Sequence, residues 1–317
     1  MGISGDDPSH RCVARVGVGA MGCLFEAIVW GDDADWCAGV AREALGVVED
    51  LDQQLSHYKS TSDITRLNAW ASHSPVRVEP GLFGLLSQCA EWTRITGGAF
   101  DVAVGALLDC WGFHTGAGRV AGAEEISEAM SRSGMAHVAL EPETDLVHFL
   151  RPGIRLNLGA VGKGYALDCA AELLRRYGVT RALLHGGLST ILAVGTAPDP
   201  AVRRLTVRNP VGGQFLATVE IADNALATSG AYHQFVEAEG VRYGHIIDPR
   251  TGWPSDTVIT VSVVARSAAA ADALSTALFI LGPEAGCDLQ RDGHIDGFTM
   301  LSRGDGGDLI VTSAGLP

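Results

Sequence analysis

The segment around which this chain is organised reads Arg155-Leu-Asn-Leu-Gly159-Ala-Val-Gly162-Lys163-Gly164-Tyr165-Ala-Leu-Asp168. Apolar residues alternate at Ile154, Leu156 and Leu158, which predicts a strand, and a helix is expected from about Gly162 to Tyr177. The free N–H groups at a helix start, together with Lys163, suit a phosphate or pyrophosphate. The segment fits neither a P-loop nor a G-x-G-x-x-G motif, so a plain strand–turn–helix joint is the alternative.

The composition limits the classes of partner. The 317 residues are 47% hydrophobic and 19% charged, which is typical of a globular protein with a sizeable core. A net charge of −14 disfavours nucleic acid as a partner, and an anionic ligand would need local cations or a metal. The seven cysteines form no C-x-x-C pair, which disfavours a disulfide framework and a structural zinc site.

The chain has no apolar run long enough to cross a membrane, so no integral membrane segment is expected. Asp6 and Asp7 do not fit the basic start of a signal peptide, and the glycine-rich run before Cys23 does not fit a lipoprotein signal. We expect a cytoplasmic protein, although a trimmed N-terminus would allow a periplasmic or membrane-associated one. Residues 1–20 are expected to form a flexible extension, and residues 21–317 a single domain.

The order of the predicted elements indicates the fold class. Helices are expected at 32–55, 80–96, 123–133, 162–177 and 267–282. Strands are expected at 22–30, 136–141, 145–150, 181–185, 190–194, 206–208, 215–221, 258–264, 297–301 and 308–312. Because strands and helices are mixed rather than strictly alternating, an α+β fold is predicted.

Asp272 and Thr276 lie four residues apart in an otherwise apolar helix, so both side chains fall on one helix face. A carboxylate there is costly to bury unless it is paired or bound to a metal. A carboxylate beside a hydroxyl suits a hard cation such as Mg²⁺, which keeps phosphate oxygens in the rest of its shell. The alternative is a solvent-facing Asp272 and a Thr276 that bonds back to its own helix.

Three other residues each have a structural interpretation beside a functional one. His245 precedes a tight turn and is either a base or ligand contact or an ordinary core or surface histidine. Trp111 either belongs to the core or stacks on a flat ring. Asp168 either lies on a solvated helix face, makes a structural hydrogen bond, or contacts a ligand.

Taken together and in order, seven motifs resemble the ApbE family of FAD:protein FMN transferases, across residues 21–282. They are Met21-Gly22, Ser56-x-Tyr58…Ser62-Asp-Ile-x-Arg66-Leu-Asn68, Gly98-Ala-Phe-Asp101…Trp111-Gly-Phe113, Leu158-Gly-x-Val-Gly-Lys163-Gly-Tyr-Ala-x-Asp168, Thr228-Ser-Gly230-x-Tyr232, His245-Ile-Ile-Asp-Pro-x-Thr-Gly252 and Ala271-Asp272-Ala-Leu-Ser-Thr276-Ala. The resemblance implies a T-fold-related α+β architecture, with two interleaved subdomains and an FAD cleft between them.

The resemblance also assigns site residues. Magnesium ligands would be Asp272, Thr276 and the main-chain carbonyl of Gly162. The remaining positions would surround FAD. Met21, Tyr58, Trp111 and Asp168 would lie near its flavin or adenine ring, Lys163 at the pyrophosphate, and Thr228, Ser229, Gly230 and His245 at the reaction site, with Asp101 as a further FAD-binding residue.

The implied reaction is a magnesium-dependent transfer of FMN from FAD to a Thr or Ser hydroxyl of an acceptor protein with an Asp-Gly-x-Thr-type motif. AMP is released, and His245 and Asp272 are the expected catalytic residues. An FAD pyrophosphatase and a non-catalytic FAD-binding protein are the alternatives, and a homodimer is left open. The chain departs from the family pattern at Cys23, Ala103, Asn157 and Leu188.

Overall fold

The computed structural model describes residues 12–113, 118–198, 204–231, 235–238, 240–304 and 306–316. Its main element is an eight-stranded sheet in the order β1-β2-β6-β7-β10-β13-β14-β15, in which all neighbours are antiparallel. The strands are β1 (Cys12–Ala20), β2 (Cys23–Gly31), β6 (Ala182–Gly186), β7 (Thr190–Val194), β10 (Ala225–Gly230), β13 (Val258–Ala265), β14 (Gly297–Arg303) and β15 (Leu309–Ala314).

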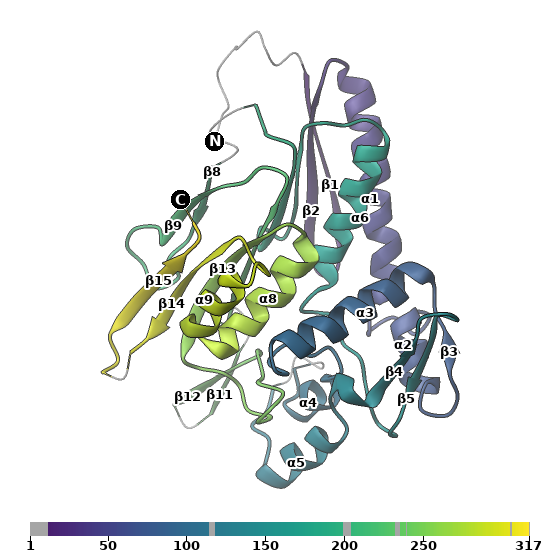
Figure 1. Ribbon diagram of the computed structural model, residues 1–317, viewed down its shortest axis with the longest axis vertical. Coiled ribbons are helices and arrows are strands. Elements are labelled where there is room, and N and C mark those ends of the chain that lie inside the picture. Colours follow the sequence, from purple (N-terminus) through teal and green to yellow (C-terminus); the bar gives the residue numbers. More distant parts are fainter. Residues whose placement is uncertain are drawn as a thin grey trace.

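Three helices cover one face of this sheet: α1 (Ala34–Leu55), α6 (Gly162–Arg176) and α8 (Ala268–Leu281) (Figure 1). Phe25, Ala27 and Val29 of β2 belong to the buried cluster beneath α1 and α6, as the two-residue period of a strand requires. On the other face, the hairpin of β8 (Arg204–Val207) and β9 (Ala217–Glu220) contributes to a smaller core around Trp30 and Leu226. Helix α9 (Pro283–Arg291) follows α8 and packs on β14.

A second group of elements is inserted between α1 and α6 and lies at the lower right of Figure 1. It comprises α2 (Asp63–Trp70), β3 (Val76–Arg77), α3 (Pro80–Ile95), α4 (Gly105–Cys110), α5 (Ala123–Ser131), the 3₁₀ helix η1 (Met135–His137), β4 (Val138–Glu141) and β5 (Leu146–Phe149). The strands form a sheet in the order β3-β5-β4, and β11 (Phe235–Ala238) pairs with β12 (Val241–Gly244) in a separate hairpin. The α+β prediction is confirmed.

The predicted strand at Ile154–Leu158 is wrong, because this segment belongs to no sheet. Asn68 takes the place of a neighbouring strand: its side-chain amide accepts from Leu156 N at 2.7 Å and donates to Leu156 O at 3.0 Å. The adjacent backbone groups bond to the segment that leads into α4, through Asn157 N to Val102 O and Gly105 N to Arg155 O. The segment is therefore extended, but side-chain and loop contacts replace a ladder.

The expected extension at residues 1–20 is wrong for residues 12–20, which form β1 and pair with β2 along its full length. The two strands are joined by the two-residue turn Met21-Gly22, where both residues have positive φ, at 49° and 74°. That combination defines the hairpin turn that matches the twist of the strands. Residues 1–11 lie outside the described ranges. No helix within those ranges is long and apolar enough to span a membrane.

Candidate active site

The first turns of α6 and α8 meet at Gly164. A Cβ atom on Gly164 would lie 2.2 Å from the carbonyl oxygen of Ala268, so the two helices can approach this closely only because residue 164 is glycine. Asp168, one turn further along α6, accepts hydrogen bonds from Ala268 N at 2.8 Å and Ala269 N at 2.9 Å. Two helix N-termini, each with a partial positive charge, are thereby held together.

The carboxylate of Asp272 lies where these two helix starts meet. Its side chain is only 6% exposed, so the solvent-facing alternative is wrong. One oxygen accepts from Gly164 N at 3.1 Å, and the other accepts from Thr190 Oγ1 at 3.4 Å. Thr190 is the first residue of β7 and fully buried. Segments far apart in the sequence therefore meet around one carboxylate.

The surroundings of the buried Asp272 carboxyl compensate for its burial only in part. Burial raises the pKa of its carboxyl, while the nearby Lys163 ammonium and the bonds from Gly164 and Thr190 lower it. Within the described ranges, no lysine or arginine nitrogen lies within 4.0 Å of this carboxylate. A buried acid without a close cation is costly, and a bound cation would remove that cost.

Several hydroxyl groups lie beside Asp272 at the contact between β10 and α8. Thr276 Oγ1 donates to Asp272 O at 3.3 Å, so the back-bonded alternative for Thr276 is found. The same hydroxyl lies 3.3 Å from Ser229 Oγ, which in turn lies 2.8 Å from Ser275 Oγ. Ser275 was not predicted as a site residue, because an isolated serine in an alanine-rich helix carries no distinguishing signal.

The available donors fit a hard divalent cation. No group of three or more His, Cys, Asp or Glu side chains in the described part of the chain could hold a metal ion. The predicted ligands are instead one carboxylate, one hydroxyl and one main-chain carbonyl, from Asp272, Thr276 and Gly162. All three are oxygen donors, and so small a set leaves coordination positions for phosphate oxygens, as Mg²⁺ prefers.

Thr228 and Ser229 point to opposite faces of the sheet, as consecutive strand residues must. Ser229 faces α8, whereas Thr228 Oγ1 lies 2.7 Å from Ser262 Oγ on β13. Thr228 N donates to Ser189 O at 2.7 Å, so its backbone still positions the β6–β7 turn. Of the two predicted hydroxyls, the structure brings only that of Ser229 to α8, the helix that carries Asp272. Gly230 ends β10, and Tyr232 of the same motif lies outside the described ranges.

His245 follows β12 and is half-buried. Its imidazole packs edge-on against Phe113, with ring centroids 6.5 Å apart. Its assignment as the catalytic base stays a prediction.

Two of the residues that the resemblance assigns to FAD binding make structural contacts within the protein. Trp111 is 0% exposed and donates from Nε1 to Gly252 O at 2.9 Å, which favours the core interpretation over a stacking surface. Asp101 accepts from Ala103 N at 2.7 Å and Met135 N at 2.8 Å. The bonds of Asp168 to α8 likewise favour its structural interpretation. FAD contacts by these three residues stay predictions.

Met21 lies in the turn between β1 and β2 and is half-buried, whereas the Tyr58 side chain is 70% exposed. An open hollow of about 470 Å³ is lined by residues 19–24 and by Asp52 of α1. Burial raises the pKa of the Cys23 thiol, and the charges of Lys163, Asp272 and Asp52 also act on it, so the hollow adjoins the Asp272 site. Asp52 was missed because it belongs to no recognised motif.

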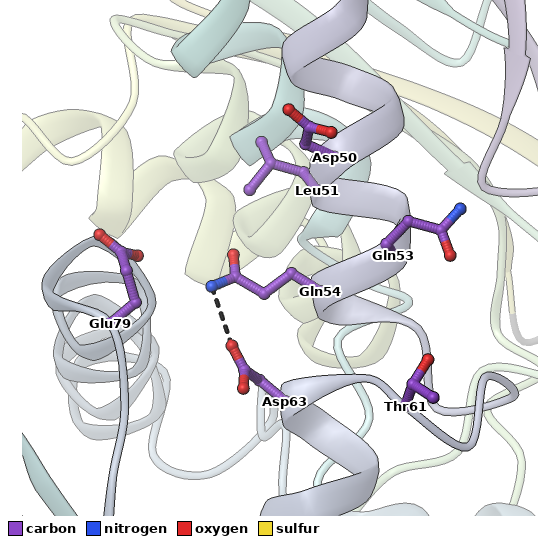
Figure 2. Close-up of a pocket in the computed structure, with 7 residues that line it drawn as sticks. All are labelled: Asp50, Leu51, Gln53, Gln54, Thr61, Asp63 and Glu79. Atoms are coloured by element: carbon purple, nitrogen blue, oxygen red, sulfur yellow. Dashed lines mark hydrogen bonds between the residues drawn. The ribbon is translucent and has the colours of Figure 1, made fainter.

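A second hollow, of about 410 Å³, is acidic and lies between α1, α2 and the start of α3. Figure 2 shows the Gln54 amide pointing at Asp63, to which it donates at 3.0 Å. Glu79 on the opposite wall caps α3 through Gly81 N and Leu82 N. None of the predicted site residues lines this hollow.

Comparisons with known proteins identify the family of the chain. The ApbE family model matches residues 21–299. An FAD:protein FMN transferase from Treponema pallidum is 35% identical over 266 residues, covering 79% of this chain and 74% of that protein. One from Escherichia coli K12 is 29% identical over 292 residues, covering 90% and 83%.

Solved structures give the same result. The ApbE protein from Thermotoga maritima superposes with a TM-score of 0.84 at 27% identity, covering 94% of this chain and 96% of that one. The apo form of the flavinyl transferase ApbE from Pseudomonas stutzeri gives 0.82 at 30% identity, covering 95% and 94%. The sheet, its helices and the buried carboxylate thus define an ApbE-like α+β protein. The chain belongs to the ApbE family.

Proposed function

We propose that this protein is an FAD:protein FMN transferase. A threonine or serine hydroxyl of an acceptor protein attacks the FMN-side phosphorus of FAD and loses its proton. The bond between the two phosphates breaks, AMP leaves, and FMN stays on the acceptor through a phosphoester. The observation that carries the proposal is the buried Asp272 carboxylate beside Lys163 and the first turn of α6. The names of the relatives and the family match support it.

The groups around Asp272 suit a pyrophosphate. The N-terminus of α6 presents backbone N–H groups and a partial positive charge, and Lys163 adds a full charge. Such fixed donors stabilise negative charge on the phosphates without rearranging during the reaction. A net charge of −14 makes this local arrangement essential, because the protein as a whole repels an anion.

Mg²⁺ would be held by Asp272, the Thr276 hydroxyl and the Gly162 carbonyl, and when bound it supplies positive charge to the phosphates. Ser229 and Ser275 orient Thr276 through their hydroxyl contacts. His245 accepts the proton of the attacking hydroxyl. A histidine suits this task because its ordinary pKa lies near neutral pH.

One assay separates this function from its alternatives. The protein is incubated with FAD, Mg²⁺ and a test protein bearing an Asp-Gly-x-Thr motif, and intact masses and released nucleotides are measured. Covalent addition of FMN with stoichiometric AMP supports transfer. Free FMN and AMP without modification indicate a pyrophosphatase, and unchanged FAD indicates binding alone; either result would refute transfer. An acceptor with Thr→Ala is the matched control.

A further inference from the structure

The segment 246–255 forms a tight turn whose geometry is fixed by its own hydrogen bonds. Asp248 N donates to Trp253 O at 2.9 Å, and Gly252 N donates to Asp248 O at 2.8 Å. The carboxylate oxygens of Asp248 accept three further bonds from Arg250, at 2.8 to 2.9 Å. Because the turn is ordered before any partner binds, a partner that contacts it loses little conformational entropy in ordering it.

This turn lies against the helix that carries the proposed metal ligands. Ser255 Oγ donates to Phe279 O of α8 at 3.3 Å, about one helical turn beyond Thr276. Ile246, which directly follows His245, is buried in the same apolar cluster as Phe279. The turn is therefore anchored next to the part of α8 that carries Thr276, and it begins at the proposed catalytic base.

Trp253 is an exposed aromatic residue on this turn. It is 42% exposed, although its ring packs edge-on against the buried ring of Trp111, with centroids 5.3 Å apart. Trp111 is itself held by its bond to Gly252 O at 2.9 Å and by the ring of Tyr243, whose centroid lies 5.5 Å away. A tryptophan that is supported from below and open to solvent above is typical of the anchors that dominate protein interfaces.

The size of this surface indicates which kind of partner it fits. A tryptophan presents about 250 Å², so the 42% that is exposed here offers about 100 Å². A stable dimer buries about 800 Å² on each partner, so Trp253 by itself does not support pairing with a second copy of this chain. A protein substrate that binds, reacts and leaves needs a smaller contact, placed next to the reacting groups.

We propose that Trp253 anchors the acceptor protein, with residues beside the acceptor threonine or serine packing on the exposed part of its indole. This assignment rests on the proposed function, in which a hydroxyl of a second protein must reach the phosphorus near Asp272. Trp253 touches no reacting atom. It is a specificity-determining residue that raises affinity for the acceptor and leaves the binding of FAD unchanged.

The test uses an acceptor protein with an Asp-Gly-x-Thr motif and its unreactive Thr→Ala form. Trp253→Ala should raise the KM for the acceptor about tenfold, and the calorimetric Kd of the Thr→Ala acceptor by the same factor. The kcat at saturating acceptor should stay within about twofold, and the Kd of FAD with Mg²⁺ should not change, as expected when only ground-state binding is lost. Trp253→Phe keeps an aromatic ring and should stay within about threefold of the wild type.

Trp36→Ala is the matched control, because Trp36 is 44% exposed and lies on the first turn of α1, far from the β11–β12 hairpin that precedes His245 (Figure 1). It should leave every constant unchanged. The assignment is overturned if Trp253→Ala binds the acceptor like the wild type, or if it weakens FAD as much as the acceptor. A wild-type protein that binds the Thr→Ala acceptor but transfers no FMN would refute the proposed function, and the Kd series would still decide the role of Trp253. A wild-type protein that neither binds nor modifies the acceptor would refute both.

Discussion

Leu188 combines two unfavourable features in one residue. It has φ of 61° in the turn between β6 and β7, and its side chain is 71% exposed. The left-handed region costs a leucine about 1–2 kcal/mol, whereas Asn adopts it more readily through local hydrogen bonds.

We therefore expect Leu188→Asn to raise the free energy of unfolding by about 1 kcal/mol, measured by urea denaturation. Leu150→Asn is the control, because Leu150 is also exposed, at 58%, but its φ is not positive. That substitution should change stability by less than about 0.5 kcal/mol. Equal effects of the two substitutions would show that backbone strain at Leu188 contributes nothing.

The residues that the sequence identified best are those whose chemistry conflicts with their surroundings. Asp272 in an apolar helix was such a conflict, and the structure buries it at the helix junction. Asp52 and Ser275 were not identified, because their importance depends on which segments fold next to them. Thr228 shows a second limit of the sequence: its motif was recognised, but the face of β10 to which its side chain points depends on the strand register.

At the scale of elements, the five predicted helices match α1, α3, α5, α6 and α8 within a few residues, because their periodicity is a local property. The shorter helices α2, α4 and α9 were not predicted. The segment 154–158 has the alternation of a strand, yet the side chain of Asn68, which is distant in sequence, takes up both backbone hydrogen-bonding groups of Leu156. Strand β10 was not predicted, because its small residues Ala225–Gly230 lack the β-branched character of strands. It forms through pairing with β7 and β13 on either side.

The hydrogen bonds by which Asp168 of α6 holds the start of α8 should make the stability of the protein depend on pH. Burial raises the pKa of Asp168 to about 6, against the two backbone N–H bonds that lower it. The folded protein thus favours the protonated carboxyl. The protonated Asp168 carboxyl therefore adds about 3 kcal/mol to the free energy of unfolding below the pKa of an unfolded aspartate. This contribution is lost as the pH rises through about 6.

The measurement compares urea unfolding of the wild type and Asp168→Asn between pH 4 and 8. The stability difference between wild type and variant should fall from pH 4 to about 6 and stay constant above that. A difference that does not change with pH would mean that Asp168 keeps an ordinary pKa.

The helix crossing itself can be tested at Gly164. Gly164→Ala places a Cβ about 2.2 Å from Ala268 O, which forces α6 and α8 apart. We expect a loss of about 3 kcal/mol in unfolding free energy and a marked loss of FMN transfer, because Asp272 loses its bond from Gly164 N. Gly162→Ala is the control: a Cβ there meets nothing within 4 Å, and the main-chain carbonyl is kept. Similar damage from both substitutions would contradict the assigned role of the crossing.

At the scale of the whole molecule, we expect Asp272 to link the stability of the chain to the binding of its ligands. The site joins α6, α8, β7 and β10, so a ligand bound there bridges elements from residues 162 to 276. In the metal-free protein, burial of the Asp272 carboxylate lowers the free energy of unfolding. Asp272→Asn removes that desolvation cost while keeping the shape of the side chain. We therefore expect this variant to be at least as stable as the wild type without ligands, and to be inactive.

With Mg²⁺ and FAD added, the wild type should become more stable than Asp272→Asn. Saturation to 100 times Kd stabilises the wild type by about 2.7 kcal/mol, since only the folded state has the site. FAD and Mg²⁺ together should raise the wild-type melting temperature by more than the sum of their separate effects, because each completes the other's binding groups. In Asp272→Asn this excess should vanish, while FAD alone should still stabilise the protein through contacts that need no metal. Calorimetric melting curves with each ligand alone and with both together measure this excess. An excess that is unchanged in the variant would show that Asp272 is not a metal ligand.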